Sequence, residues 1–290
     1  MNNFHRKLRD LLPLLLLLLG LSGATSATEG GGSNYLPGFY GDFAMAVFPD
    51  QGTHFNNFFA GWGDRSANTG TLLEMPGVLH VTGKQVLGGN LIVGLYPALM
   101  GALDDTGKHQ GRFGLGDFYL VPFALNWRWG KLTALAFEGV VAPTGRFTKN
   151  EFNLGRNVWT FDHMLLLTYE LPANNELSMA IGYMNNTVNP ATHYQSGDEF
   201  HFDYTLAHNL EGGFGVGVVG SYYKQVTADH APRPFDAPPY SEAATIGPAL
   251  LYTPKLGGRD VAMSVKWLHE FNVTGRAPND YLVWRVFLPF

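Results

Sequence analysis

The last eleven residues of the chain, 280–290, constrain the fold most strongly. In a β-strand successive side chains point to opposite faces, so one face of this stretch would carry Leu282, Trp284, Val286, Leu288 and Phe290. A strand of about ten residues with one wholly apolar face is typical of a transmembrane β-barrel, in which that face meets lipid. The terminal aromatic also fits a closing strand that the barrel assembly machinery would bind. A secreted β-sandwich is the alternative.

Residues 1–27 have the order of a secretory signal peptide. Three basic residues precede an apolar run, Leu11 to Leu21, and small residues occupy 22–27. The run is too short to cross a bilayer as a helix. We therefore expect export, with cleavage after Ala27 or, as the alternative, after Ala24.

Composition limits the possible classes of protein. The chain has no cysteine, which excludes a disulfide framework and a thiolate nucleophile. Without the leader, the 19 basic and 24 acidic residues fall to 16 and 23, and this net charge near −7 argues against a nucleic-acid partner. Aromatic residues make up 14% and charged residues only 15%, against about 25% charged residues in soluble domains. A barrel fits these values, because its hydrophobicity lies in alternate residues.

Twelve segments of strand length recur at residues 55–290 without a dividing linker, so we predict one all-β domain, a transmembrane antiparallel β-barrel of about 12 strands. The segments are 55–64, 72–82, 87–100, 115–129, 132–143, 159–171, 176–188, 199–208, 214–225, 244–253, 259–271 and 281–290. Short and long connections alternate between them. This alternation predicts short periplasmic turns and longer external loops.

Residues 28–54 precede the predicted wall. They begin with a polar, glycine-rich tail, and an aromatic-rich stretch between Pro37 and Pro49 follows. A further wall strand here would make the number of strands odd, whereas bacterial barrels have even numbers. We therefore predict that this stretch is a plug-like segment, a short helix or coil packed inside or beneath the barrel.

The predicted strand faces separate lipid from lumen. Aromatic residues near both ends of 159–171 suggest a lipid-facing side, and in 115–129 we assign Tyr119, Val121 and Phe123 to that side. The lumen is predicted to be mixed, because small residues such as Ala134 and Ala136 accompany the charged ones. The predicted charged and polar lumen residues are Glu138, Glu170, His201, Asp203, Lys266 and Arg285. Such a lining favours an apolar solute or a packed plug over a water-filled pore.

Catalytic and cofactor motifs are weak. Gly215, Gly217 and Gly220 match GxGxxG, but the strand pattern continues where a nucleotide-binding helix would begin. His163, His208 and His269 fall on predicted lipid-facing sides without a GxSxG motif, so we interpret them as interfacial residues. We predict no catalytic residue, no metal site and no cofactor.

Three stretches in the middle of the chain carry a resemblance to a known family. They are Gly114–Pro122, Gly139–Phe147 and Asn153–Asp162, and together they resemble outer-membrane proteins assigned to the MetA pathway of phenol degradation. The similarity extends over most of the mature chain. It implies a β-barrel in the bacterial outer membrane that passes aromatic or other hydrophobic compounds, and it implies no catalytic residues.

These observations predict a monomeric, passive outer-membrane channel for small hydrophobic or aromatic molecules. A plugged barrel with a structural or partner-binding role is the second interpretation, and an envelope lipid hydrolase or acyltransferase is the third. Loop 144–158 and its neighbours form a predicted ion-paired gate at the outer mouth, with loop anchoring as the alternative role. The residues of this predicted gate are Asp117, Arg146, Arg156, Asn157 and Asp162.

Overall fold

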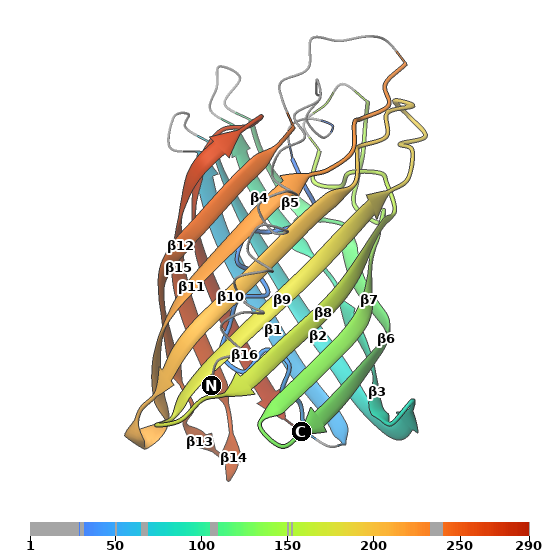
Figure 1. Cartoon of the computed structure of the whole chain (residues 1–290). Coiled ribbons are helices and arrows are strands. Elements are labelled where there is room, and N and C mark those ends of the chain that lie inside the picture. The colour runs from blue at the N-terminus through green and yellow to red at the C-terminus, as the bar shows by residue number, and fades with distance from the viewer. Residues whose placement is uncertain are drawn as a thin grey trace, which may run out of the picture.

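The computed structural model describes residues 29, 32–49, 51–64, 69–104, 110–149, 151, 153–232 and 240–289. They form a closed antiparallel β-barrel, with long loops at one end and tight turns at the other (Figure 1). The strands are β1 (Gly52–Asp64), β2 (Thr69–Val86), β3 (Gly89–Tyr96), β4 (Leu99–Asp104), β5 (Gln110–Leu115), β6 (Phe118–Trp129), β7 (Leu132–Ala142), β8 (Thr160–Glu170), β9 (Asn175–Asn186), β10 (Glu199–Asn209), β11 (Phe214–Gln225), β12 (Glu242–Tyr252), β15 (Ala262–Thr274) and β16 (Asn279–Pro289). No helix among the described residues is long and apolar enough to cross a membrane.

The barrel closes because β1 pairs with both β16 and β2. The remaining wall strands pair with their neighbours in sequence order. β3 and β4 act as two halves of one wall strand, as do β5 and β6, so the fourteen strands of the sheet form twelve wall strands. The predicted strand number is therefore confirmed.

Two wall strands are interrupted at the same level. β3 ends before Pro97 and β4 begins at Leu99, while β5 ends before Gly116 and β6 begins at Phe118. Proline lacks the N–H that a sheet ladder needs, and one hydrogen bond from Gly116 N to Ala98 O (2.9 Å) spans the break. The predicted single segments 87–100 and 115–129 are therefore each divided. The wall therefore extends further at the loop end on this side of the barrel, where β4 pairs with β2 and β5 pairs with β4.

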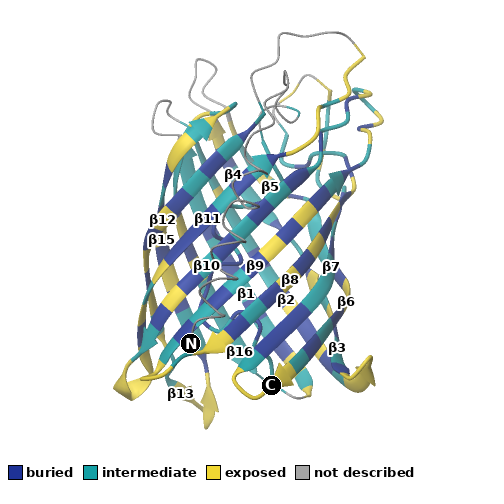
Figure 2. Ribbon diagram, in the orientation of Figure 1, coloured by how far each residue is buried: buried dark blue, intermediate teal, exposed yellow. Residues whose placement is uncertain are grey.

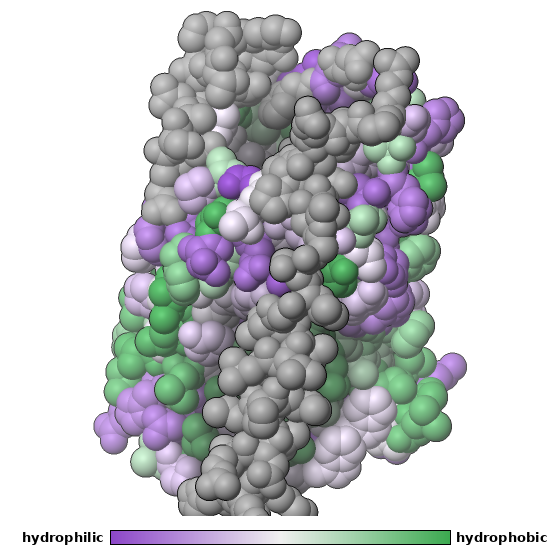
Figure 3. All heavy atoms as spheres, turned by 45° about the horizontal axis from the view of Figure 1, so that its top comes forward, coloured by the Kyte–Doolittle hydropathy of each residue, from purple (hydrophilic) through white to green (hydrophobic). Residues whose placement is uncertain are grey.

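Side chains alternate between lipid and lumen as the pattern predicts. Buried and exposed residues follow one another along the strands (Figure 2), and hydrophobic side chains gather on both visible flanks of the wall (Figure 3). In β16 the outward residues Leu282 and Trp284 are half exposed, whereas Tyr281 and Val283 are buried inside. Phe290 lies outside the described residues, so its contact with the assembly machinery stays a prediction. The leader, 1–27, also lies outside them.

The assignment of Tyr119 and Val121 to the lipid face was wrong. Both point into the lumen, and Phe123 points outward with 51% of its surface exposed. The register of β6 against β7 shifts between Leu120 and Phe123, next to Pro122. Such a bulge adds one residue to the strand, which exchanges the two faces on either side of it.

The β12 to β15 turn differs from the prediction. Residues 259–260 do not belong to β15, because Arg259–Asp260 (β14) pairs with Lys255–Leu256 (β13) in a small hairpin below the barrel. The wall strand begins only at Ala262. This hairpin between β12 and β15 thus extends beyond the wall at the turn end.

Residues 32–49, which we call the lumen segment, run inside the barrel (Figure 1). Near its start Asn34 donates to Thr160 at the loop end of β8 (2.6 Å), and near its other end Ala46 N donates to Thr168 at the turn end (3.1 Å). The segment consists of turns and coil and contributes no residue to the wall. The predicted plug-like position is confirmed as lying inside the barrel rather than beneath it.

Candidate functional site: a partly filled lumen

The lumen segment is anchored to one side of the barrel by polar contacts with β8, β9, β10 and β15. Tyr35 donates to Asp203 Oδ2 and Tyr40 donates to Asp162 Oδ2, both at 2.9 Å. Ser264 donates to Asp42 Oδ2 at 2.8 Å. All these groups are buried, and burial is tolerated because each polar group has a partner. Most of these anchors lie on one side of the wall, and fewer polar contacts reach the other side, where Asn126 of β6 donates to the Ala46 carbonyl oxygen (2.7 Å).

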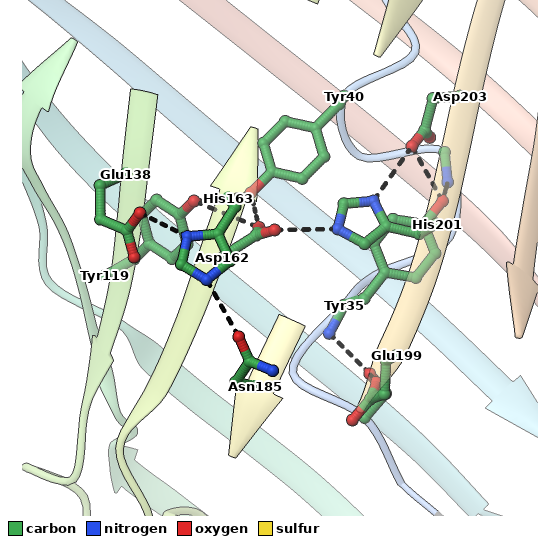
Figure 4. Close-up of polar contacts among 12 residues, drawn as sticks. Tyr35, Tyr40, Tyr119, Glu138, Asp162, His163, Asn185, Glu199, His201 and Asp203 are labelled. Carbon is green, nitrogen blue, oxygen red and sulfur yellow. Dashed lines mark hydrogen bonds and ion pairs between the residues drawn. The ribbon is translucent and has the colours of Figure 1, made fainter. Parts of the chain in front are cut away.

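His201 is the centre of this anchoring (Figure 4). Its ring is fully buried between Tyr35 and Tyr40, with centroid distances of 4.2 and 5.7 Å. Its Nε2 lies 3.0 Å from Asp162 Oδ1, and its Nδ1 lies 3.9 Å from Asp203 Oδ2. Two wall carboxylates and two tyrosines of the segment therefore converge on one histidine. The arrangement holds the upper part of the lumen segment to β8 and β10.

Lys266 anchors the middle of the segment. Its ammonium donates to the carbonyl oxygens of Phe39 (3.2 Å) and Gly41 and lies 3.9 Å from Asp42 Oδ2. Nearer the turn end, Ala44 N donates to Glu176 Oε1 at 2.6 Å. The segment's own backbone groups are thus bonded by wall side chains, as a non-helical chain inside a barrel requires.

Two cavities lie between the lumen segment and the opposite wall. The first, of about 550 Å³, is the mouth cavity at the loop end, lined by both apolar residues and polar ones such as Asn153 and Arg276. The second is the inner cavity, of about 70 Å³, and it lies deeper in the lumen. Its lining is almost wholly apolar: Phe39, Tyr40, Met45, Phe48, Asn56, Phe58, Met75, Leu79, Ile92, Tyr96, Tyr119, Val121, Ala124, Leu135, Phe137, Leu166 and Arg285.

Met75 and Tyr119 line both cavities, so they mark the constriction between them. The Tyr119 hydroxyl lies 2.8 Å from the Tyr40 hydroxyl of the lumen segment, and this contact narrows the lumen. Tyr96 lies at the same level, where a Cβ on Gly77 would come within 2.0 Å of its ring. Glycine at position 77 therefore gives the Tyr96 ring its space. The cavities form one interrupted path along the β1–β7 side.

The predicted gate residues separate into two places. Asp117 accepts hydrogen bonds from Gly145 N (2.8 Å) and Arg156 N (2.7 Å), which holds these two parts of the loop between β7 and β8 together at the mouth. Among the residues that the structure describes, the Arg156 guanidinium donates to the carbonyl oxygens of Glu29 and Gly32. Asn157 donates to Asn189 Oδ1 (2.8 Å). The contacts are those of loop anchoring, and a gating role stays a prediction.

Of the two other predicted gate residues, Asp162 lies apart from this cluster and Arg146 lies within the same loop. Asp162 is deeper in the lumen, bonded to Tyr40 and His201. The Arg146 carbonyl accepts a bond from Gly155 N (3.3 Å), and its side chain has no described polar contact. The sequence indicated that these residues are near strand ends, but it could not indicate that Arg156 reaches the N-terminal tail.

The loops around the mouth are tied to one another. Asp229 accepts bonds from Gly197 N (2.7 Å), Gln225 (2.7 Å) and the Tyr194 hydroxyl. Burial raises the pKa of the Asp229 carboxyl, and the hydrogen bonds oppose that shift. Asn189 donates to the Glu29 carboxylate (3.1 Å), so this rim also contacts the start of the chain that leads into the lumen.

Arg156→Ala should free the start of the lumen segment, because it removes two hydrogen bonds to backbone carbonyls worth about 1–3 kcal/mol together. The chain has no cysteine, so a spin label on Ser33→Cys reports this region alone. We expect a sharper, more mobile spectrum in the variant. Arg146→Ala in the same loop is the matched control and should leave the spectrum unchanged. Equal spectra for Arg156→Ala and the control would contradict the anchoring role.

The assignment of Glu138 to the lumen was wrong. Glu138 points to the outside of β7, where its Oε2 lies 2.7 Å from His163 Nδ1, and the other nitrogen of His163 lies 3.0 Å from Asn185 Oδ1 (Figure 4). Ala136, on the same face of β7, lines the same outer groove and was also assigned wrongly, as was Ala134. Both faces of β7 are largely apolar, so a single glutamate decided the assignment. Its partner on β8 makes an outward position tolerable, because a paired charge near the membrane edge costs less.

Four of the five other predicted lumen residues point inward. His201, Asp203 and Lys266 are buried, and Arg285 lines the inner cavity. Glu170 lies exposed at the turn end of β8 and not within the closed lumen. The sequence pattern did not single out Tyr35, Tyr40, Asp42, Asn56 or Tyr96. The aromatic content of the segment after Pro37 was a signal for the region of Tyr40 and Asp42, whereas no pattern indicated Tyr35, Asn56 or Tyr96, or the partners of any of the five.

Metal ligands do not gather in the part of the chain that the structure describes, since no three His, Asp or Glu side chains there are placed to hold an ion.

The chain is similar to a known family of proteins. A family model described as "Putative MetA-pathway of phenol degradation" matches residues 56–286. The chain belongs to this family. Its match includes the wall from β1 to β16 and the interrupted strands. No match is found among curated proteins.

The chain is similar to several solved structures, and the first of them supports the fold. The COG4313 outer membrane channel from Pseudomonas putida F1 superposes with a TM-score of 0.73 at 13% identity, covering 89% of this chain and 100% of that one. The CymD monoaromatic hydrocarbon channel gives a TM-score of 0.43 at 6% identity, with 83% and 89% covered. The translocator domain of the autotransporter NalP from Neisseria meningitidis gives 0.45 at 8% identity, with 82% and 88% covered. The family member described here has the fold of an outer-membrane β-barrel.

Proposed function

We propose that this family member is a passive channel through which small hydrophobic or aromatic molecules cross the outer membrane as a monomer. The observation that carries the proposal is the path of two cavities between the lumen segment and strands β1–β7. The path changes from a partly polar mouth to an aromatic interior, which suits a molecule that leaves water for an apolar surrounding. Membership of a family named for phenol degradation supports the solute class.

The small volume of the inner cavity favours the second candidate, a plugged barrel with a structural or partner-binding role. The inner cavity measures about 70 Å³, whereas an apolar cavity of about 150 Å³ holds one benzene. An aromatic solute can therefore pass only when side chains move. Met45 and Met75 line the cavity, and methionine adapts its shape more readily than branched or aromatic residues.

Uptake by proteoliposomes separates the two candidates. The protein is refolded into vesicles, and entry of a labelled aromatic acid and an uncharged aromatic is compared with entry into empty vesicles. Faster entry of either solute supports a channel. Entry no faster than through lipid, with the barrel verified as folded, supports the plugged barrel. Release of fatty acid from the vesicle lipid in the same samples tests the third candidate, a lipid hydrolase.

Ala124→Leu should reduce aromatic uptake about tenfold or more, because it adds three carbon atoms to the wall of an already tight cavity. Ala136→Leu is the matched control: it lies on the neighbouring strand, adds the same volume and points to the lipid. The two variants should fold alike and differ in flux. Equal flux in both would show that the inner cavity is not on the path.

A further inference from the structure

We propose that the inner cavity, widened by movement of lining side chains such as Met45 and Met75, binds the ring of an aromatic carboxylate and that the guanidinium of Arg285 holds the carboxylate group. This inference rests on the proposed function, because the solute would reach the cavity along the channel. It adds a solute class, aromatic monoacids, and a residue that selects it.

The lining of the inner cavity combines many rings with one permanent charge. Aromatic side chains come from both sides, with Phe39 and Phe48 on the lumen segment and Phe58, Tyr96 and Phe137 on the wall. Arg285 is the charged side chain among the lining residues. A planar apolar molecule with a single anionic substituent matches this distribution, because its ring meets rings and its charge meets the guanidinium.

The Arg285 guanidinium is held in place yet keeps free bonding capacity. Its Nε donates to Asn56 Oδ1 (2.8 Å), and Asn56 in turn donates to the Tyr96 hydroxyl (2.9 Å). Its Cζ atom lies 5.7 Å from the centroid of the Phe58 ring and 5.5 Å from the centroid of the Phe287 ring. Nη2 has no hydrogen bond to any residue that the structure describes, and the side chain keeps 12% of its surface exposed. A fixed guanidinium with an open nitrogen can donate hydrogen bonds to a carboxylate with little loss of freedom.

The local charge balance also favours an anion. Asp42 is the carboxylate nearest to Arg285, at 3.9 Å from Nη1, and the same Oδ2 lies 3.9 Å from Lys266. This oxygen also accepts a hydrogen bond from Ser264. Two cations thus share one carboxylate that is already bonded elsewhere. Because a buried charge without a close partner is costly, a solute carboxylate at Nη2 would be stabilised there.

Binding and flux of benzoate and benzyl alcohol test the inference. The two probes have the same ring, and only benzoate is charged near pH 7. In wild-type protein we expect benzoate to bind and to enter vesicles. Arg285→Met should reduce benzoate binding and flux about tenfold or more while benzyl alcohol flux stays within about twofold, because charged hydrogen bonds are lost and volume is kept. Arg285→Lys should give intermediate benzoate binding and flux, since lysine keeps the positive charge but lacks the paired N–H donors of the guanidinium.

Lys255→Met is the matched control, because it removes a cation that is 77% exposed on the hairpin at the turn end. It should change neither solute. If the wild-type protein binds benzoate through Arg285 but passes no solute, the channel fails and this inference stands. If the wild-type protein passes both solutes and Arg285→Met changes both equally or neither, the inference is overturned and the channel stands. Absence of benzoate binding by the folded wild type also overturns the inference.

Discussion

A shortened chain that begins at Phe48 is expected to form a barrel that passes small polar solutes at least about tenfold faster than the intact protein. The reason is that a wall of twelve strands encloses more space than its own side chains fill. The wall ladder contains no residue of the lumen segment, so the barrel hydrogen bonds remain. The removed residues include Tyr35, Tyr40 and Asp42, whose wall partners would then face water.

Liposome swelling with sugars of increasing size measures this effect. A synthetic peptide with the sequence of residues 32–47 is the control for specificity, and its addition should lower the permeability again. Circular dichroism confirms the β-barrel in the shortened chain. Unchanged sugar permeability in a folded barrel would contradict the role of the lumen segment as the main obstruction.

Asp162→Ala is expected to lower the free energy of unfolding by about 3–5 kcal/mol, the cost of removing one partner from a buried charged pair. Asp162 is 2% exposed and binds both Tyr40 and His201, so its loss leaves two buried groups without their main partner. Denaturant unfolding of the refolded protein in lipid vesicles measures the change. The variant should also become more permeable to sugars, because the segment is held less firmly.

Thr168→Val provides the comparison for Asp162→Ala. Thr168 bonds Ala46 N (3.1 Å) and Ser178 (2.9 Å) through a neutral hydroxyl, so its loss should cost only about 1–3 kcal/mol. In a double-mutant cycle, Asp162→Ala and His201→Ala should be non-additive by about 1–3 kcal/mol, since the two residues are in contact. Additive effects would show that the Asp162–His201 contact does not stabilise the segment.

The alternation of apolar and other side chains predicted the lipid-facing side correctly where one face of a strand is wholly apolar, as in β16. There a shift by one residue would move Leu282 and Trp284 from lipid into the lumen, so only one register is compatible with burial. The same reasoning failed in β6 and β7. In β6 a bulge at Pro122 exchanges the faces, and in β7 two apolar faces leave the register undecided until Glu138 finds His163.

The lumen could be predicted less well than the wall. Sequence indicated that the stretch after Pro37 is not a wall strand, because a thirteenth strand would prevent the chain from closing as an even barrel. It did not indicate that the stretch descends from the loop end to the turn end. That path depends on contacts such as Tyr35 with Asp203 and Ser264 with Asp42, which are more than 160 residues apart in the chain.

By itself the sequence determined the class of fold, because a period of two in hydrophobicity, repeated twelve times, can satisfy both lipid and backbone hydrogen bonds only in a closed barrel. Tertiary structure alone decided what the barrel encloses. Inside, buried polar side chains from distant strands need partners, and only the closed wall places Asp162, His201 and Lys266 around the lumen segment. The same closure leaves the aromatic cavity at Arg285 on the opposite side.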